Sequence, residues 1–154
     1  MFALHELARR VLHLQDQIDG LDAVLRPLVA ATAPALVARH GVGPGTAGAL
    51  LVAAGDNPER LHSEAGFAHF CGAAPIDASS GLVTRKRLNR GGDRSANEAL
   101  WRTVMVRMVS DPRTREYVQR RTKDGLSKKE VIRCLKRYVA RELYPLLAGP
   151  RRTS

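Results

Sequence analysis

The stretch "LHELARRVLHLQDQIDGLDAVLRPL", from Leu4 to Leu28, decides the fold because its apolar residues repeat with a helical period. They recur at alternating intervals of three and four residues, at Leu4, Leu7, Val11, Leu14, Ile18, Leu21, Leu25 and Leu28. This spacing places one narrow apolar seam on a single helix face, which is typical of a coiled coil. The segment therefore predicts a helix that associates with a second copy or with a partner helix. A long helix packed on its own domain is the alternative.

Pro27 and the residues that follow it set the predicted domain boundaries. A proline removes one helical hydrogen bond and clashes with the preceding turn, so we expect this helix to kink or end one or two residues earlier. We assign residues 1–34 to a coiled-coil or dimerisation helix, residues 35–148 to a compact domain and residues 149–154 to a disordered tail. Aromatic residues make up only 5% of the chain, so its core must consist mainly of Leu, Val and Ala. The predicted fold class is all-α.

Charge is distributed unevenly along the chain, whose formal net charge is +10. Residues 82–154 hold 20 of the 25 Lys and Arg residues but only 7 of the 15 Asp and Glu residues. This concentration indicates a polyanionic partner, most simply nucleic acid, although a well-solvated basic surface is the alternative. The chain has no apolar run of about 20 residues and no secretory signal. We therefore expect a cytoplasmic protein without a membrane partner.

The two cysteines, Cys71 and Cys134, do not form a pattern that is typical of metal or disulfide sites. Neither belongs to a Cys-x-x-Cys pair and both have apolar neighbours, so we expect two buried, unreactive thiols. His62 and His69 have no third ligand nearby in the sequence. The sequence therefore predicts no metal site and no cofactor within this chain.

Capping residues mark three helix starts in the rest of the chain. Ser63 and Asp93 each precede a helix-forming segment, and "SKKE", from Ser127 to Glu130, has the pattern of a capping box. The last helix should run to about Leu147. Its expected inner face consists of Val131, Leu135, Tyr138, Val139, Leu143 and Leu146.

A glycine-rich segment, Gly41-Val42-Gly43-Pro44-Gly45, lies between a predicted helix that ends near residue 40 and one that begins at Thr46. Glycines allow positive φ and let backbone N–H groups come close to a ligand at a helix N-terminus. The pattern is that of a helix-hairpin-helix, a module that holds a DNA phosphate through backbone amides. A tight turn between two core helices is the alternative.

The segment "CGAAPIDASSGLVTRKRLNRGGD", from Cys71 to Asp93, combines two adjacent hydroxyls with several cations. Ser79-Ser80-Gly81 falls at a predicted turn, and a basic strand follows with Arg85, Lys86 and Arg87, which predicts a small β-hairpin near Ser80. A serine beside cations can attack a phosphodiester whose charge the cations offset. Asp77 is the only carboxylate within a few residues, so no general base is evident. These residues leave two interpretations open, a nucleophilic serine and a simple Ser-Ser-Gly turn.

Four motifs, taken in their order along the chain, resemble one known family. They are "HGVGPGTAGALLVAAGD", "GFAHFCGAAPIDASSG", "KRLNRGGDRSANEALW" and "DPRTREYVQRRTKDGLSKKEVIRCLKRYVARELYPLL". Over about residues 35–147 they resemble the C-terminal transposase domain of the bridge-RNA-guided, DEDD-type insertion-sequence transposases, also called serine-dependent recombinases. The heptad helix is similar to the coiled coil that precedes this domain in the family.

The resemblance implies a role for Ser80, which stands directly before Gly81 as the family's nucleophile stands before its glycine. That serine attacks the scissile phosphate and forms a transient protein–DNA link. The resemblance also implies a guide RNA, and Mg²⁺ held by an acidic N-terminal domain of a second protomer. Asp16, Asp19 and Asp22 lie on the heptad helix and do not match that acidic motif. We therefore expect this chain to hold the serine half of the site without the metal half, and to bind nucleic acid but not to catalyse alone.

The remaining candidate residues are expected contacts to nucleic acid. The backbone amides of Gly41, Gly43 and Gly45 would hold phosphates at the glycine-rich turn. Cations near Ser80 would do so at the hairpin, namely Arg85, Lys86, Arg87 and Arg90. The basic helices would hold DNA or guide RNA through Arg94, Arg120, Arg121, Lys128, Lys129, Arg133, Lys136 and Arg137. The alternative function is a non-catalytic nucleic-acid-binding remnant or regulator that acts through the coiled coil.

Overall fold

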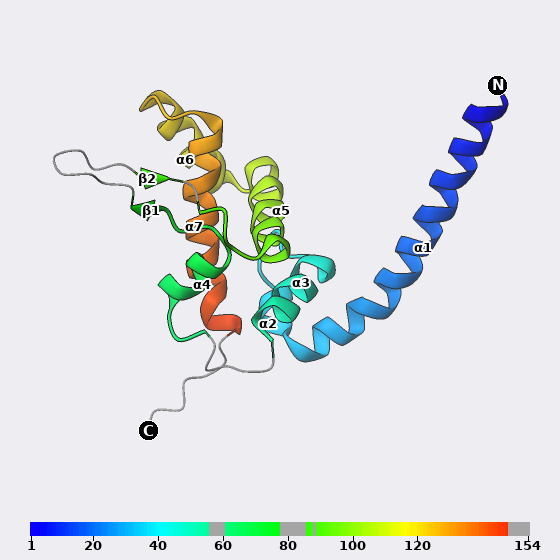
Figure 1. Ribbon diagram of the computed structural model, residues 1–154, viewed down its shortest axis with the longest axis horizontal. Coiled ribbons are helices and arrows are strands. Elements are labelled where there is room, and N and C mark those ends of the chain that lie inside the picture. Colours follow the sequence, from blue (N-terminus) through cyan, green and yellow to red (C-terminus); the bar gives the residue numbers. More distant parts are fainter. Residues whose placement is uncertain (56–60, 78–85, 88, 148–154) are drawn as a thin grey trace.

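The computed structural model describes residues 1–55, 61–77, 86–87 and 89–147, and within these residues the chain is helical, as predicted (Figure 1). The helices in chain order are α1 (Phe2–Thr32), α2 (Pro34–Val37), α3 (Pro44–Ala54), α4 (Glu64–Phe70), α5 (Arg94–Ser110), α6 (Pro112–Lys123) and α7 (Lys128–Leu147). Two short strands, β1 (Ile76–Asp77) and β2 (Lys86–Arg87), stand between α4 and α5.

The first helix, α1, projects from the rest of the chain as a long arm (Figure 1). The seam side chains from Leu4 to Leu21 are between 40% and 70% exposed. The arm meets the other helices only near its C-terminal end, where Val29 is buried. The sequence prediction of a long helix with an apolar seam is therefore confirmed, and from Leu4 to Leu21 no described residue of this chain covers the seam.

The prediction that Pro27 kinks or ends α1 is wrong as to the end, because the helix continues to Thr32, while a kink stays a prediction. A proline in a helix interior costs about 3 kcal/mol. Packing of the last turns against α3 offsets this cost: a Cβ at Gly48 would lie 3.5 Å from Leu25 Cδ1 and 3.6 Å from Val29 Cγ2. Tertiary contact, which the local sequence does not reveal, therefore carries the helix past its proline.

The core lies where α3, α4 and α5 meet α7. Its largest fully buried side chains include Leu36 of α2, Leu50 of α3, Phe67 of α4, Leu100 and Val104 of α5, and Val131 and Leu143 of α7. The phenol of Tyr144 is also buried, and its hydroxyl donates a 2.7 Å hydrogen bond to the carbonyl of Leu61. Helix α7 is thus the central element, and its outer side is free to carry charge.

The three predicted caps are confirmed. The Ser63 hydroxyl accepts a hydrogen bond from the Gly66 N–H at 3.0 Å, and the Asp93 carboxylate accepts one from the Ala96 N–H at 2.7 Å. Before α7, the Ser127 N–H and hydroxyl both donate to the Glu130 carboxylate, at 2.8 and 2.6 Å. These bonds satisfy backbone donors that a helix start leaves unpaired.

The glycine-rich turn precedes α3, which begins at Pro44 and not at Thr46 because proline suits the first helical position. Gly41 has φ of +80°, and a Cβ there would lie 3.1 Å from the Thr103 carbonyl oxygen on α5. A positive φ and close contact with α5 therefore explain this glycine. Gly43 and Gly45 are exposed at the start of α3.

The two strands pair antiparallel, with Ile76 opposite Arg87 and Asp77 opposite Lys86. Residues 78–85, which include Ser79, Ser80 and Arg85, lie outside the described residues. The small hairpin predicted around Ser80 therefore stays a prediction.

Candidate nucleic-acid interface

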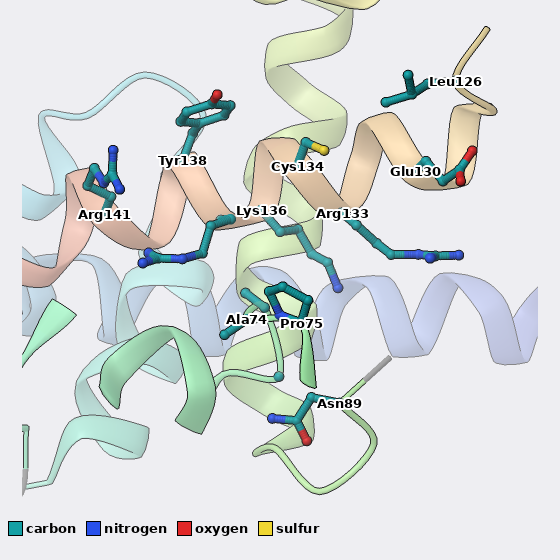
Figure 2. A pocket seen from close by; sticks show the side chains of 13 residues that line it. Ala74, Pro75, Asn89, Leu126, Glu130, Arg133, Cys134, Lys136, Tyr138 and Arg141 are labelled. Atoms are coloured by element: carbon teal, nitrogen blue, oxygen red, sulfur yellow. The ribbon is translucent and has the colours of Figure 1, made fainter. Parts of the chain in front are cut away.

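The outer side of α7 borders a hollow of about 540 Å³, which we call the first hollow (Figure 2). One wall is the loop from Gly72 to Pro75 with Asn89, and the other consists of α7 side chains and Leu126. The α7 residues are Glu130, Arg133, Cys134, Lys136, Arg137, Tyr138 and Arg141. Figure 2 shows Lys136 pointing from α7 toward the loop of Ala74 and Pro75, while Tyr138 projects from the opposite side of the helix. The hollow therefore extends across the cationic face of α7.

Glu64, on α4, neutralises part of this face. Its carboxylate forms ion pairs with Arg137 and, at 3.4 Å, with Arg141. Burial and the neighbouring Arg141 lower the pKa of Arg137. Arg137 therefore helps to hold α4 against α7 through its ion pair with Glu64. Arg133, in contrast, is exposed and forms no ion pair with any described residue.

Lys136 is the buried cation of this face, with only 8% of its surface exposed. Its ammonium donates a 3.0 Å hydrogen bond to the Asn97 side-chain oxygen on α5. Within the described residues no carboxylate lies within ion-pair distance of it, and burial followed by the charge of Arg133 lowers its pKa. Because a buried charge is costly without a counterion, an anion would be stabilised here.

A second hollow, also of about 540 Å³, adjoins the first. The two hollows share Gly72, Asn89 and Lys136, so they meet at the Lys136 side chain. The other residues of the second hollow are Arg90, Gly92, Arg94, Asn97, Glu98 and Trp101. The Glu98 carboxylate is paired with Arg102 at 2.7 Å. The free charges of this hollow are therefore mainly positive.

Two asparagines fix the wall between the hollows. The Asn89 amide donates to the His69 carbonyl at 2.9 Å, and the Asn97 amide donates to the Cys71 carbonyl at 2.6 Å. The Asp93 N–H also donates to the Phe70 carbonyl at 2.7 Å. The loop after α4 and the loop before α5 are thus bonded to each other and, through Asn97, to Lys136.

The sequence analysis placed Tyr138 on the inner face of α7, and this prediction is wrong, because Tyr138 is 53% exposed. Its ring packs edge-on against Tyr117 of α6, with centroids 5.7 Å apart, and the Arg120 guanidinium lies 5.6 Å from the Tyr117 centroid. The buried tyrosine of α7 is Tyr144. A half-exposed aromatic ring in a hollow that arginines also line is a site where a nucleobase can stack.

The predicted cations fall into separate groups. The hollows bring together Arg90, Arg94, Arg133, Lys136 and Arg137. They do not include Arg120 and Arg121 on α6, where Arg121 is paired with Asp124 at 3.1 Å, or the exposed Lys128 and Lys129 at the start of α7. Gly41, Gly43 and Gly45 lie at the α2–α3 turn, outside both hollows. Ser80 and Arg85 lie outside the described residues, and for Lys86 and Arg87 only the strand backbone is described.

Sequence reasoning missed Asn89, Asn97 and Trp101 as residues of the site. Trp101 is 44% exposed although it follows the fully buried Leu100. The sequence held one signal for Trp101. It adjoins Leu100, which recurs with Ala96 and Val104 at intervals of four residues as the apolar side of a helix. A residue next to such a buried position lies at the edge of the buried face, where it can be partly exposed.

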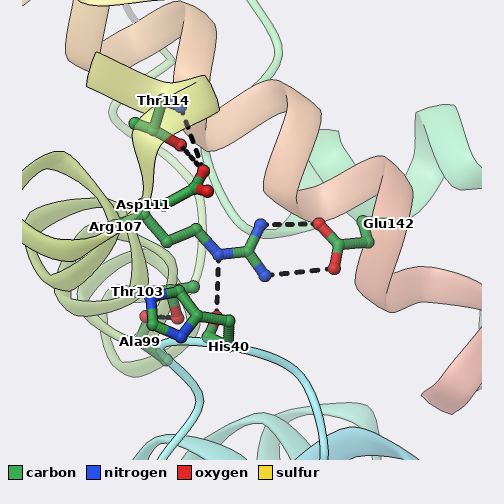
Figure 3. A network of polar contacts seen from close by, with 7 residues as sticks. All are labelled: His40, Ala99, Thr103, Arg107, Asp111, Thr114 and Glu142. Atoms are coloured by element: carbon green, nitrogen blue, oxygen red, sulfur yellow. Dashed lines mark hydrogen bonds and ion pairs between the residues drawn. The ribbon is translucent and has the colours of Figure 1, made fainter. Parts of the chain in front are cut away.

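An ion pair between α5 and α7 holds the interface helices in place (Figure 3). Arg107 donates two hydrogen bonds to Glu142, at 2.6 and 3.0 Å, and a third to the His40 carbonyl at 2.8 Å. The Arg107 side chain is 13% exposed. This bidentate contact links α5, α7 and the turn before α3.

Two features are absent from the part of the chain that the structure describes. No three His, Cys, Asp or Glu side chains come together in a group that could hold a metal ion. None of the helices among these residues is long and apolar enough to span a lipid bilayer.

Comparison with known proteins identifies the family. Residues 33–119 match the family described as Transposase IS116/IS110/IS902 family. The chain is also 30% identical over 144 residues to the insertion element IS110 uncharacterized 43.6 kDa protein of Streptomyces coelicolor. That match covers 92% of this chain and 35% of the relative, so the chain spans about a third of the relative's length. The predicted transposase family is thereby confirmed, and the chain belongs to the IS116/IS110/IS902 transposase family.

Proposed function

We propose that this chain is the serine-bearing, DNA-strand-exchange part of an insertion-sequence transposase. The observation that carries the proposal is that a chain of this family brings together, around two adjoining hollows on α5 and α7, several cations that form no ion pair with any described residue. Arg90, Arg94, Arg133 and Lys136 would hold the sugar–phosphate backbone of DNA or of a guide RNA. Such contacts position a nucleic acid without reading its sequence.

Ser80 would be the nucleophile, an assignment that rests on the order of the sequence motifs around it. Its Oγ would form a bond to the scissile phosphorus while the bond from phosphorus to one deoxyribose oxygen breaks. The serine gives up its proton and the departing oxygen takes one up, so the step needs no oxidant or reductant. Cations beside the phosphate would offset the charge that develops on its oxygens.

Mg²⁺, which the family resemblance implies, does not fit the described residues of this chain, because they hold no cluster of three carboxylate, histidine or cysteine side chains. We expect a separate acidic domain to supply it, with two protomers completing one site.

A covalent-trapping experiment tests the nucleophile. The chain would be mixed with Mg²⁺, a separately supplied acidic domain of the family and a nicked DNA that traps protein–DNA links. We expect a linked species with the wild-type chain and none with Ser80→Ala, whereas Ser79→Ala should behave as the wild type. A linked species that forms equally with Ser80→Ala would refute the assignment.

The exposed seam of α1 favours a second candidate, a non-catalytic regulator that captures a partner through this helix. Its apolar side chains lie free over most of the arm, and such a stripe is the docking face of a coiled coil. A regulator of this kind would form heterodimers that Leu14→Asp abolishes, and its inhibition of the partner would not depend on DNA affinity.

A further inference from the structure

We propose that the two hollows form one binding track for an unpaired nucleic-acid strand, with a phosphate on Lys136 and bases on Tyr138 and Trp101. The inference rests on the proposed function and names the form of nucleic acid that this surface accepts. It depends on three observations: a buried cation shared by both hollows, an exposed aromatic ring in each, and the positions of the remaining cations.

The shared cation argues for a phosphate that enters the hollows. Lys136 is 8% exposed and hydrogen-bonded only to the neutral Asn97, so its charge has no counterion among the described side chains. Lys136 lines both hollows, so an anion in either of them can reach its ammonium. Arg133 and Lys136 both line the first hollow, so the pair can present two positive charges to one group. A bridging phosphate satisfies both cations.

The aromatic rings argue for unpaired bases. Tyr138 borders the first hollow and Trp101 the second, and they are 53% and 44% exposed. Stacking on an aromatic ring requires a free base face, and a duplex keeps its base faces inside the helix. Lys136 and Tyr138 project from opposite sides of α7, so a single strand would cross the first hollow from one to the other and reach Trp101 through the second hollow. Such a combination of cationic groove and aromatic rings is the usual construction of single-strand sites.

The size of the hollows agrees with this occupant. Each has a volume of about 540 Å³, within the range of about 300–1,000 Å³ that pockets for compact organic ligands occupy. Apolar walls of Ala73, Ala74 and Pro75 border the first hollow and would contact a sugar or base edge. Arg90 and Arg94 also line the second hollow, so they could hold the phosphates of the nucleotides bound there.

The single tryptophan of the chain, Trp101, provides a direct probe. Short oligothymidylate, oligouridylate of the same length and a hairpin duplex would each be titrated into the full chain. We expect either single strand to quench Trp101 emission and to bind at least about tenfold more tightly than the duplex, because only unpaired bases can stack on the two aromatic rings. The DNA and RNA arms show which backbone the track prefers. Absence of quenching, or duplex affinity equal to that of the single strands, would overturn the proposal.

Matched lysine variants test the shared cation. Lys136→Met should weaken single-strand binding about tenfold. Lys123→Met removes the same charge from an exposed position on α6, outside both hollows, and should have a much smaller effect. Equal effects of the two variants would contradict the proposal. If Lys136→Met does not fold, single-strand affinity would be measured for Tyr138→Leu instead, which changes an exposed residue. An affinity equal to that of the wild type would also contradict the proposal.

The result also separates this inference from the proposed function. If only the duplex binds, DNA binding stands and the single-strand track is wrong. If neither single strand nor duplex binds, the proposed function itself fails.

Discussion

Gly92 offers the sharpest test of how the interface is built, because no side chain fits at this position. A Cβ at Gly92 would lie 2.3 Å from the Gly72 nitrogen, 2.6 Å from the Gly72 Cα and 2.8 Å from the Phe70 carbonyl oxygen. All three atoms belong to the backbone, so no side chain can turn away to make room. Gly92→Ala must therefore push apart the loop after α4 and the loop before α5.

The expected cost follows from that geometry. Overpacking in a tight region typically costs about 1–3 kcal/mol, and here the contact between two backbones is lost as well, so we expect about 3 kcal/mol. For a chain of this size that loss lowers the melting temperature by about 10 °C. The loops that separate would carry Asn89 and the Asp93 cap with them, so single-strand binding should also weaken.

Gly91→Ala is the matched control. Gly91 is exposed, its φ is not positive, and a Cβ there would meet only the Asn89 side-chain oxygen at 3.6 Å, an ordinary contact. Alanine at this position should leave stability unchanged or raise it by less than about 1 kcal/mol. Urea unfolding followed by circular dichroism would compare the two variants with the wild type. A Gly92→Ala variant that loses less than about 1 kcal/mol, or no more than Gly91→Ala, would refute the close packing of the two loops.

Three further predictions concern other parts of the chain. Leu14→Asp should abolish self-association through α1 in sedimentation experiments without loss of helicity, since Leu14 is 40% exposed, and an unchanged sedimentation coefficient would contradict a coiled-coil seam. The Thr114 hydroxyl donates a 2.5 Å hydrogen bond to the Asp111 carboxylate and thereby lowers the pKa of that carboxyl in the folded chain. The contribution of this bond to the stability of the fold is therefore present above the unfolded pKa of about 3.9 and is lost as the pH falls through the folded pKa. Thr114→Val should therefore destabilise the chain more at neutral pH than under acid conditions, and a pH-independent difference in urea unfolding would count against this bond. In a Cys134→Ser variant, the remaining thiol of Cys71 should react with a disulfide reagent only after unfolding, because burial raises its pKa to about 12. Rapid reaction of the folded chain would contradict the burial of Cys71.

Local signals in the sequence were sufficient for the helices and their caps. The seam from Leu4 onward predicted α1, and Ser63, Asp93 and the Ser127–Glu130 pair predicted three helix starts. Each of these features depends on residues within one or two helical turns. The continuation of α1 past Pro27 depends on contact with α3, which lies further along the chain, and could not be read from the local pattern.

The candidate site was predicted in its composition but not in its arrangement. Lys136 stands between Leu135 and Arg137, so the sequence indicates a surface lysine, and its burial results from Asn97 and the loop after α4. Arg137 was predicted to bind nucleic acid, yet Glu64, far away in the sequence, pairs with it. A glycine at position 41 is compatible with a phosphate-binding turn and with close packing against Thr103. The packing role depends on the fold and could not be predicted from the local sequence. Long-range partners therefore decide which cations remain free.

The salt dependence of nucleic-acid binding tests the central claim most directly. If Arg90, Arg94, Arg133 and Lys136 hold phosphates of a single strand, log K should fall linearly with log salt with a slope of about −3, since each contact contributes about 0.7. Arg133→Gln should reduce the magnitude of that slope by roughly one contact. The assay is fluorescence anisotropy of a labelled oligothymidylate at several salt concentrations. An affinity that does not change with salt would contradict the assignment of this surface to nucleic acid.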